Sequence, residues 1–215
     1  GNTMKYIMMG TSSNFGNMFS MAGASLFLPF LPMLPIQILL NNLLYDLSEL
    51  PIPLDRVDDD YLSTPQRWDM GFIRNFMVVF GPVSSFFDFL TFCIMLKSFD
   101  AQALLFHTGW LIESIATQVL VIFIIRTRRN SFPSRPHPWL LACALLTVAV
   151  ATLLPFTPAG TQLGFVAPPP FFFVILAGIL LCYLLAAESM KQWFFRRFYP
   201  ETRSEAKPEP KPVRA

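Results

Sequence analysis

Two acidic residues, Asp46 and Glu49, lie inside an otherwise apolar stretch at residues 36–50. Polar and charged side chains are expensive in hydrocarbon, so those that are kept there indicate function. On a helix, Asn42, Asp46 and Glu49 are spaced i, i+4, i+7 and share one face, where their oxygens would converge. The spacing predicts a cation site in a membrane-embedded domain.

The composition is typical of an integral membrane protein. Of the 215 residues, 53% are hydrophobic and only 14% are charged, which is far from an ordinary soluble domain. Continuous apolar runs of about 20 residues favour membrane-spanning helices over a barrel, whose strands alternate. The basic residues behind the net charge of +2 sit at the edges of these runs, so nucleic acid is not an expected partner and the lipid bilayer is.

The hydropathy predicts an all-α membrane protein, a six-transmembrane-helix bundle. The expected spans are residues 5–28, 34–52, 72–96, 104–125, 138–155 and 170–190. Basic residues follow the fourth span, beginning at Arg126, and the sixth span, beginning at Lys191. By the positive-inside rule these segments are cytoplasmic, which predicts that both termini are cytoplasmic too.

The domain prediction is a membrane domain at residues 1–199 and a tail at residues 200–215. The tail consists largely of Pro, Glu, Lys and Arg, cannot bury enough apolar surface to fold, and is expected to be disordered and cytoplasmic. Residues 53–75, rich in Asp, form a polar cytoplasmic loop. It is either solvated or docked against another cytoplasmic domain.

Amide side chains on the first span could complete the cation site. Asn14 and Asn17 are spaced i, i+3 and point to one side, so they either form interhelical hydrogen bonds or join Asn42 and Asp46 as ligands. Carboxylate and amide oxygens suit a hard ion such as magnesium or calcium. The chain has no Cys or His cluster suited to copper or zinc.

Two further acidic residues, Asp88 and Glu113, lie deep in predicted spans. Each is an outer cation ligand, a proton carrier or part of a packing network. Glu188 and Lys191, spaced i, i+3, are expected to form an interfacial ion pair.

Residues near the predicted span ends receive structural roles. His107 is expected on the surface. Interfacial anchoring is predicted for Trp68, Trp110, Trp139 and Trp193. The prolines between the first two spans form either a rigid turn or a broken helix end that coordinates an ion; they are Pro29, Pro32 and Pro35.

Several segments resemble a known family. Residues 2–17, with Thr11-Ser12-Ser13-Asn14-Phe15-Gly16-Asn17, resemble the fifth transmembrane helix of P-type cation pumps. Residues 29–46, with Asn41-Asn42-Leu43-Leu44-Tyr45-Asp46, resemble the sixth. Residues 81–88 and 109–114 are similar to the bacterial magnesium-transporting branch. The resemblance extends to about Tyr199 and implies transmembrane helices five to ten of such a pump.

The resemblance implies that Asn14, Asn17, Asn42 and Asp46 fall where the family has cation ligands, with Tyr45 beside them. Tyr45, Glu49, Asp88 and Glu113 are secondary candidates. In the family, the site also uses the fourth helix, and the fifth helix couples it to the phosphorylation domain. Where calcium pumps have an acidic residue in the fifth helix this chain has Asn17, which favours a single divalent ion. The implied function is ATP-driven magnesium import across a bacterial inner membrane, with Mg²⁺ as the transported ion.

The chain carries no glycine-rich phosphate loop and no Asp-Lys-Thr-Gly sequence, so alone it is not expected to hydrolyse ATP. We therefore expect a fragment whose partners are the N-terminal helices and cytoplasmic domains of the pump, with ATP used only by the full-length protein. The alternatives are a stand-alone interaction or regulatory subunit without transport activity, and an autonomous channel or carrier.

Overall fold

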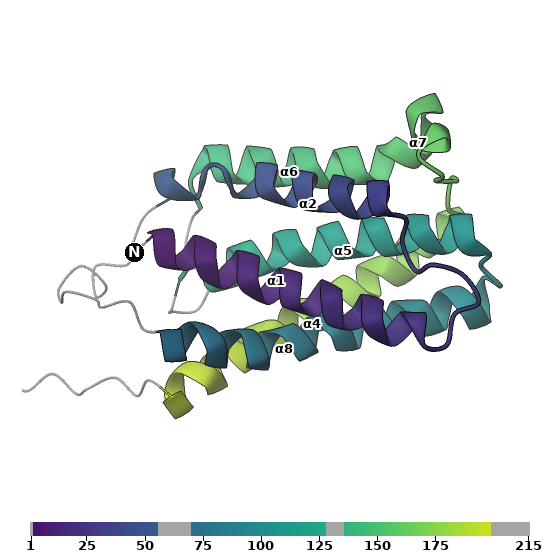
Figure 1. The fold of residues 1–215 in the computed structure, drawn as a ribbon. Coiled ribbons are helices and arrows are strands. Elements are labelled where there is room, and N and C mark those ends of the chain that lie inside the picture. Colours follow the sequence, from purple (N-terminus) through teal and green to yellow (C-terminus); the bar gives the residue numbers. More distant parts are fainter. Residues whose placement is uncertain (1, 56–69, 128–135, 199–215) are drawn as a thin grey trace, which may run out of the picture.

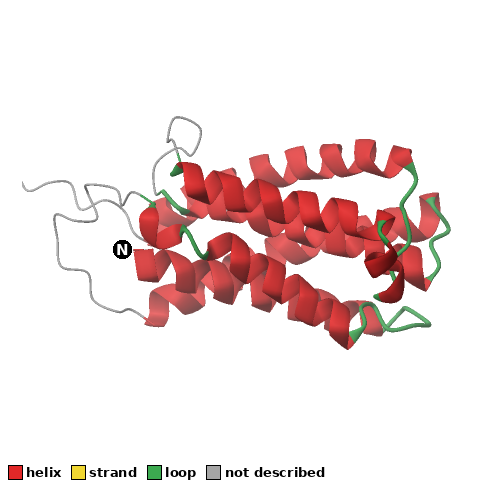
Figure 2. Cartoon of the chain, turned by 90° about the horizontal axis from the view of Figure 1, so that it is seen from above, coloured by secondary structure: helices red, strands yellow, loops and turns green. Residues whose placement is uncertain are grey.

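The computed structural model describes residues 2–55, 70–127 and 136–198. Its long helices are α1 (Asn2–Ser25), α2 (Pro35–Glu49), α4 (Met70–Ser98), α5 (Ala103–Ile125), α6 (Pro138–Leu153) and α8 (Pro170–Phe198). Short helical pieces are η1 (Ile52–Leu54), η2 (Leu154–Phe156) and α7 (Pro158–Gln162). The described residues contain no strand (Figure 2), which confirms the all-α prediction. The predicted tail and most of the predicted acidic loop lie outside the described residues.

Each predicted span coincides with a long helix, but not every helix is a clear membrane span. Four are long and apolar enough to cross a membrane, namely α4, α5, α6 with η2, and α8. In α2 there are only 15 residues, a length of about 22 Å. In α1, the mostly polar segment Thr11–Asn17 interrupts the apolar sequence of a continuous helix. The count of six spans therefore stays a prediction.

Proline marks the start of three helices. Pro35, Pro138 and Pro170 occupy the first positions of α2, α6 and α8, where the missing N–H needs no partner. Pro29 and Pro32, the other prolines predicted to lie between the first two spans, are in the link at residues 26–34. This link turns the chain from α1 into α2 (Figure 1).

His107 holds this turn. Its Nε2 lies 2.7 Å from the carbonyl oxygen of Leu31, and the residue is only 3% exposed. The expectation that His107 is a surface residue is wrong, because the start of α5 lies beneath the turn.

The central helix of the bundle is α5. It packs against α1, α2, α4, α6 and α8, and nearly every residue from Phe106 to Ile125 is buried. Trp110 is 2% exposed, so the prediction that it anchors the protein at an interface is wrong. Trp139 and Trp193 are exposed, as interfacial anchors must be.

Small residues bring α1 and α4 close together. A Cβ at Gly16 would lie 3.2 Å from the Gly81 carbonyl oxygen and 3.3 Å from the Ser84 Cβ. The Ser85 hydroxyl donates to the carbonyls of Gly16, at 3.0 Å, and Gly81, at 3.1 Å. Close backbone approach through small residues is the usual way in which membrane helices associate.

Gly16→Leu is expected to push α1 away from α4 and to destabilise the protein by about 1–3 kcal/mol, the usual cost of overpacking. Thermal unfolding in detergent measures the loss. The matched control is Gly178→Leu on α8, where an added Cβ meets no atom within 4 Å. Equal melting temperatures for the two variants would contradict the close packing.

The two ends of the described bundle differ in their elements. The start of α1, η1, the start of α4 and the end of α8 lie at one end, and α7 lies at the other (Figure 1). The end that holds the start of α1 also carries three arginines. They are Arg126, which follows α5, and Arg196 and Arg197 in the last turn of α8.

Candidate cation site

The site begins where α1 meets α2. The two helices run in opposite directions (Figure 1), and the Ser13 hydroxyl of α1 donates to the Tyr45 hydroxyl of α2 at 3.1 Å. About one turn away, Gly10 of α1 lies beside Glu49 of α2, whose Oε2 is 4.0 Å from where a Cβ would be. These contacts define the sides on which the helices face each other.

Asn14 and Asp46 lie on the same side of this helix pair. Each directly follows a contact residue, Ser13 or Tyr45, and is therefore turned by about 100° from the contact. Since the helices are antiparallel, the two rotations lead to the same side. Both side chains are exposed in the described structure, so this side is open; Asn42, half-buried, is turned about 60° toward it.

Asn17 is oriented by the central helix. It is half-buried, and its Oδ1 accepts a hydrogen bond from the Ser114 hydroxyl at 3.4 Å. Gln118 Nε2 donates to the same Ser114 hydroxyl at 2.7 Å. Sequence reasoning missed this role of α5, although the i, i+4 spacing of Ser114 and Gln118 was a signal that both point to one side.

Burial divides the face that carries Asn42, Asp46 and Glu49. Glu49 is only 1% exposed and lies between α1 and α2, whereas Asp46 is exposed. The three side chains therefore do not all converge within the described chain, because Glu49 is buried beside Gly10 of α1 while Asp46 is exposed. Glu49 lies beside the Tyr45 hydroxyl, yet neither carboxylate oxygen accepts a well-formed hydrogen bond.

Asp88 and Glu113 form a separate cluster on the buried side of α1. Asp88 Oδ2 accepts from the Ser20 hydroxyl at 2.5 Å, and Oδ1 accepts from Trp110 Nε1 at 3.2 Å. Glu113 lies against Asp88 and is fully buried. The structure thus does not join these secondary candidates to Asn14 and Asp46.

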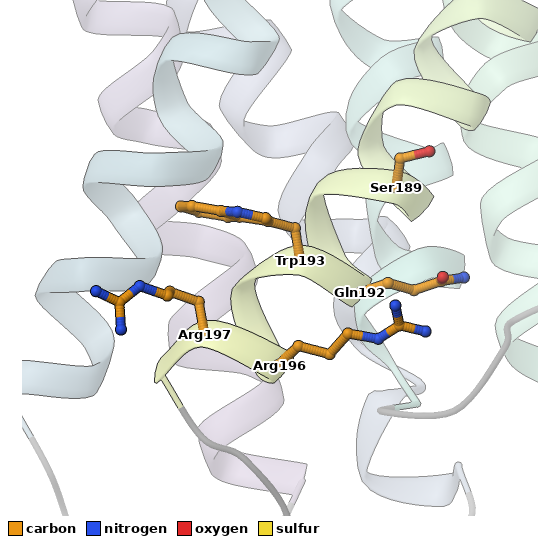
Figure 3. Close-up of a pocket in the computed structure, with 5 residues that line it drawn as sticks. All are labelled: Ser189, Gln192, Trp193, Arg196 and Arg197. Carbon is orange, nitrogen blue, oxygen red and sulfur yellow. The ribbon is translucent and has the colours of Figure 1, made fainter.

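A surface pocket at the end of α8 is lined by basic rather than acidic side chains. It is lined by Ser189, Gln192, Trp193, Arg196 and Arg197 (Figure 3). Figure 3 shows Arg196 and Arg197 extending to opposite sides of the helix. Two guanidinium groups disfavour a cation, so this pocket is not part of the candidate site.

The predicted pair of Glu188 and Lys191 is confirmed, with Nζ and Oε2 2.9 Å apart. Lys191 is fully buried and also donates to the Ile124 carbonyl at 3.0 Å, so the pair fastens α8 to α5.

In the described residues, no three His, Cys, Asp or Glu side chains gather in a group that could hold a metal. The candidate ligands on α1 and α2 are of a different kind, because three of the four are amides. Oxygen ligands of this type, with retained water, suit a hard divalent ion.

Known proteins match most of the chain. The family described as "Cation transporting ATPase, C-terminus" matches residues 30–193. The chain is 45% identical over 202 residues to "Magnesium-transporting ATPase, P-type 1" of Salmonella typhimurium (strain LT2), and 43% identical over 202 residues to the protein of that name in Escherichia coli (strain K12). Each match covers 92% of this chain and 22% of the relative. The chain thus spans about a fifth of the length of these relatives, and it belongs to the family of cation-transporting ATPase carboxy-terminal domains, which form the carboxy-terminal membrane part of P-type pumps.

Proposed function

We propose that this chain is the carboxy-terminal membrane part of an ATP-driven pump that imports Mg²⁺, and that Asn14, Asn17, Asn42 and Asp46 contribute its cation ligands. The observation that carries the proposal is the placement of Asn14 and Asp46 on the same open side of an antiparallel helix pair. The names of the relatives, which are magnesium-transporting ATPases, supply the ion.

The donor set supports a single hard divalent ion. Asp46 brings one negative charge, and the three asparagines bring neutral amide oxygens. Mg²⁺ sheds its water reluctantly and is commonly bound by one or two carboxylates with several waters retained. Ser114 and Gln118 would act as positioning residues, because they hold the amide of Asn17 from α5.

The open side of α1 and α2 would be completed by helices from the rest of the pump. The relatives are several times longer than this chain, which spans 22% of their length. The same remainder would hold the aspartate that ATP phosphorylates, and α1 would transmit its movements to the ligands.

The proposed topology has six spans with both termini cytoplasmic, in a bacterial inner membrane. The start of α1 and the end of α8 lie at the same end of the bundle (Figure 1). This end also carries Arg126, Arg196 and Arg197, which favours the cytoplasmic side by the positive-inside rule.

The test is ATP-driven uptake of Mg²⁺ into liposomes that hold the complete pump polypeptide. We expect uptake that depends on ATP, and none with liposomes that hold residues 1–215 alone. Uptake by residues 1–215 would instead indicate an autonomous carrier. A chain that copurifies with a separate, fully active pump but leaves its transport unchanged when removed would indicate a stand-alone interaction subunit.

A further inference from the structure

A second acidic centre lies inside the bundle, away from the open side of α1. Asp88 of α4 and Glu113 of α5 are 1% and 0% exposed, and their side chains interact directly. Ser20 of α1 and Trp110 of α5 donate to the two oxygens of Asp88. Neither oxygen of Glu113 accepts a hydrogen bond from the described residues.

The charge of this pair is not balanced as it is elsewhere in the bundle. Buried Asp55 lies 3.2 Å from the Arg126 guanidinium, and buried Glu188 lies 2.9 Å from the Lys191 ammonium. Within the described part of the chain, no basic side chain forms an ion pair with Asp88 or Glu113. Two adjacent carboxylates without a positive partner are very costly inside a membrane protein, so the pair needs either a bound proton or a bound cation.

The groups around the pair are hard oxygen donors. Besides the carboxylates and the Ser20 hydroxyl, the buried side chain of Tyr183 on α8 lies near both acids and beside Ser84 of α4. Hard oxygen donors select hard cations. On an octahedral Mg²⁺ with ligands at about 2.0–2.1 Å, neighbouring oxygens are about 2.9 Å apart, so two adjacent carboxylates can share one ion.

Aromatic rings shield this centre. Phe92 packs edge-on against Trp110, with ring centroids 4.9 Å apart, and Phe87 packs edge-on against Tyr183 at 5.2 Å. A cation held here would be occluded, and its binding would hold α1, α4, α5 and α8 together.

We propose that Asp88 and Glu113 bind a second hard divalent cation, separate from the ion assigned to Asn14 and Asp46. The two centres are distinct because Ser20, which contacts Asp88, is fully buried, whereas Asn14 is exposed on the open side of α1. This site does not depend on the proposed transport site, since both acids are buried inside the bundle and neither is one of the four proposed ligands.

The test uses the complete pump polypeptide in lipid nanodiscs, with Mn²⁺ as a paramagnetic probe for a hard divalent ion. Equilibrium binding and electron paramagnetic resonance count the bound ions, and thermal unfolding with and without Mn²⁺ reports the stabilisation that binding provides. Glu113→Gln, which keeps the shape of the side chain, should lower the count by one ion per chain and lose that part of the stabilisation. Thr117→Val, one turn away on α5 and also buried, is the matched control and should bind as wild type does.

Two further variants keep the result interpretable. Asp46→Asn should remove the ion assigned to Asn14 and Asp46 and leave the ion at Asp88 and Glu113. The two proposed sites are therefore tested separately. Asp88→Asn should reproduce the loss caused by Glu113→Gln, which guards against a variant that merely fails to fold. If folded Glu113→Gln or Asp88→Asn protein binds as many ions as wild type, a proton balances the pair and the proposed cation site is wrong.

Discussion

Asp46→Asn is expected to abolish Mg²⁺-stimulated ATP turnover by the complete pump at ion concentrations that saturate the wild type. Asp46 is the one carboxylate among the four proposed ligands, and cation affinity depends strongly on ligand charge. Loss of an outer partner of a metal ligand already weakens binding about 10–100-fold, so loss of the charged ligand should weaken it by at least about 100-fold. The measurement is ATPase activity in nanodiscs as a function of free Mg²⁺.

Two variants make this result specific. Asp100→Asn removes an exposed carboxylate from the turn between α4 and α5 and should leave the Mg²⁺ dependence unchanged. Glu49→Gln alters the buried acid between α1 and α2 and should affect apparent affinity much less than Asp46→Asn. If Glu49→Gln abolishes turnover and Asp46→Asn does not, the ion lies on the buried side of α2 and the proposed ligand set is incorrect.

Local features of the fold could be predicted from the sequence. The helix starts at Pro138 and Pro170 agree with the predicted spans, because a proline and the apolar run after it are both visible in the chain. The Glu188–Lys191 pair was predictable for the same reason, since its spacing alone brings the side chains together on any helix.

The inward and outward sides of the helices could not be predicted. Whether Asp46 or Glu49 is buried depends on which side of α2 its neighbouring helices cover. The hydropathy of α2 does not specify that side. Trp110 was misassigned for a related reason, because hydropathy does not reveal that α5 is surrounded by five other helices. The bond from Ser20 to Asp88 joins residues 68 positions apart, beyond the reach of any local pattern.

Most of the candidate site therefore rests on tertiary contacts. The sequence supplied the residue types Asn14 and Asp46, whose side chains are suitable for a cation. The contacts of Ser13 with Tyr45 and of Gly10 with Glu49 fix the rotation of the two helices and thus bring both residues to the same side. The central position of α5 then explains how Ser114 can orient Asn17.

Asp55→Asn is expected to cause the largest loss of stability among charge substitutions at the end of the bundle where α1 begins. Asp55 follows η1 and is buried, with Oδ1 and Oδ2 3.2 and 3.3 Å from Nη1 of Arg126. Oδ1 also accepts from the backbone N–H of His137, at 3.2 Å, so one carboxylate ties the end of α2 to the end of α5 and the start of α6. Removing one partner of a buried ion pair costs about 3–5 kcal/mol, because the other charge stays in the interior.

For a domain of this size such a loss lowers the melting temperature by on the order of 10 °C, which thermal unfolding in detergent can measure. Arg74→Gln is the control, because Arg74 is exposed and a surface charge contributes about 0–1 kcal/mol. The double variant Asp55→Leu with Arg126→Met should be much more stable than Asp55→Asn, since it removes both buried charges together. If Asp55→Asn and Arg74→Gln melt at the same temperature, the carboxylate does not tie these helix ends together, and the position of α2 relative to α5 must be set by apolar packing alone.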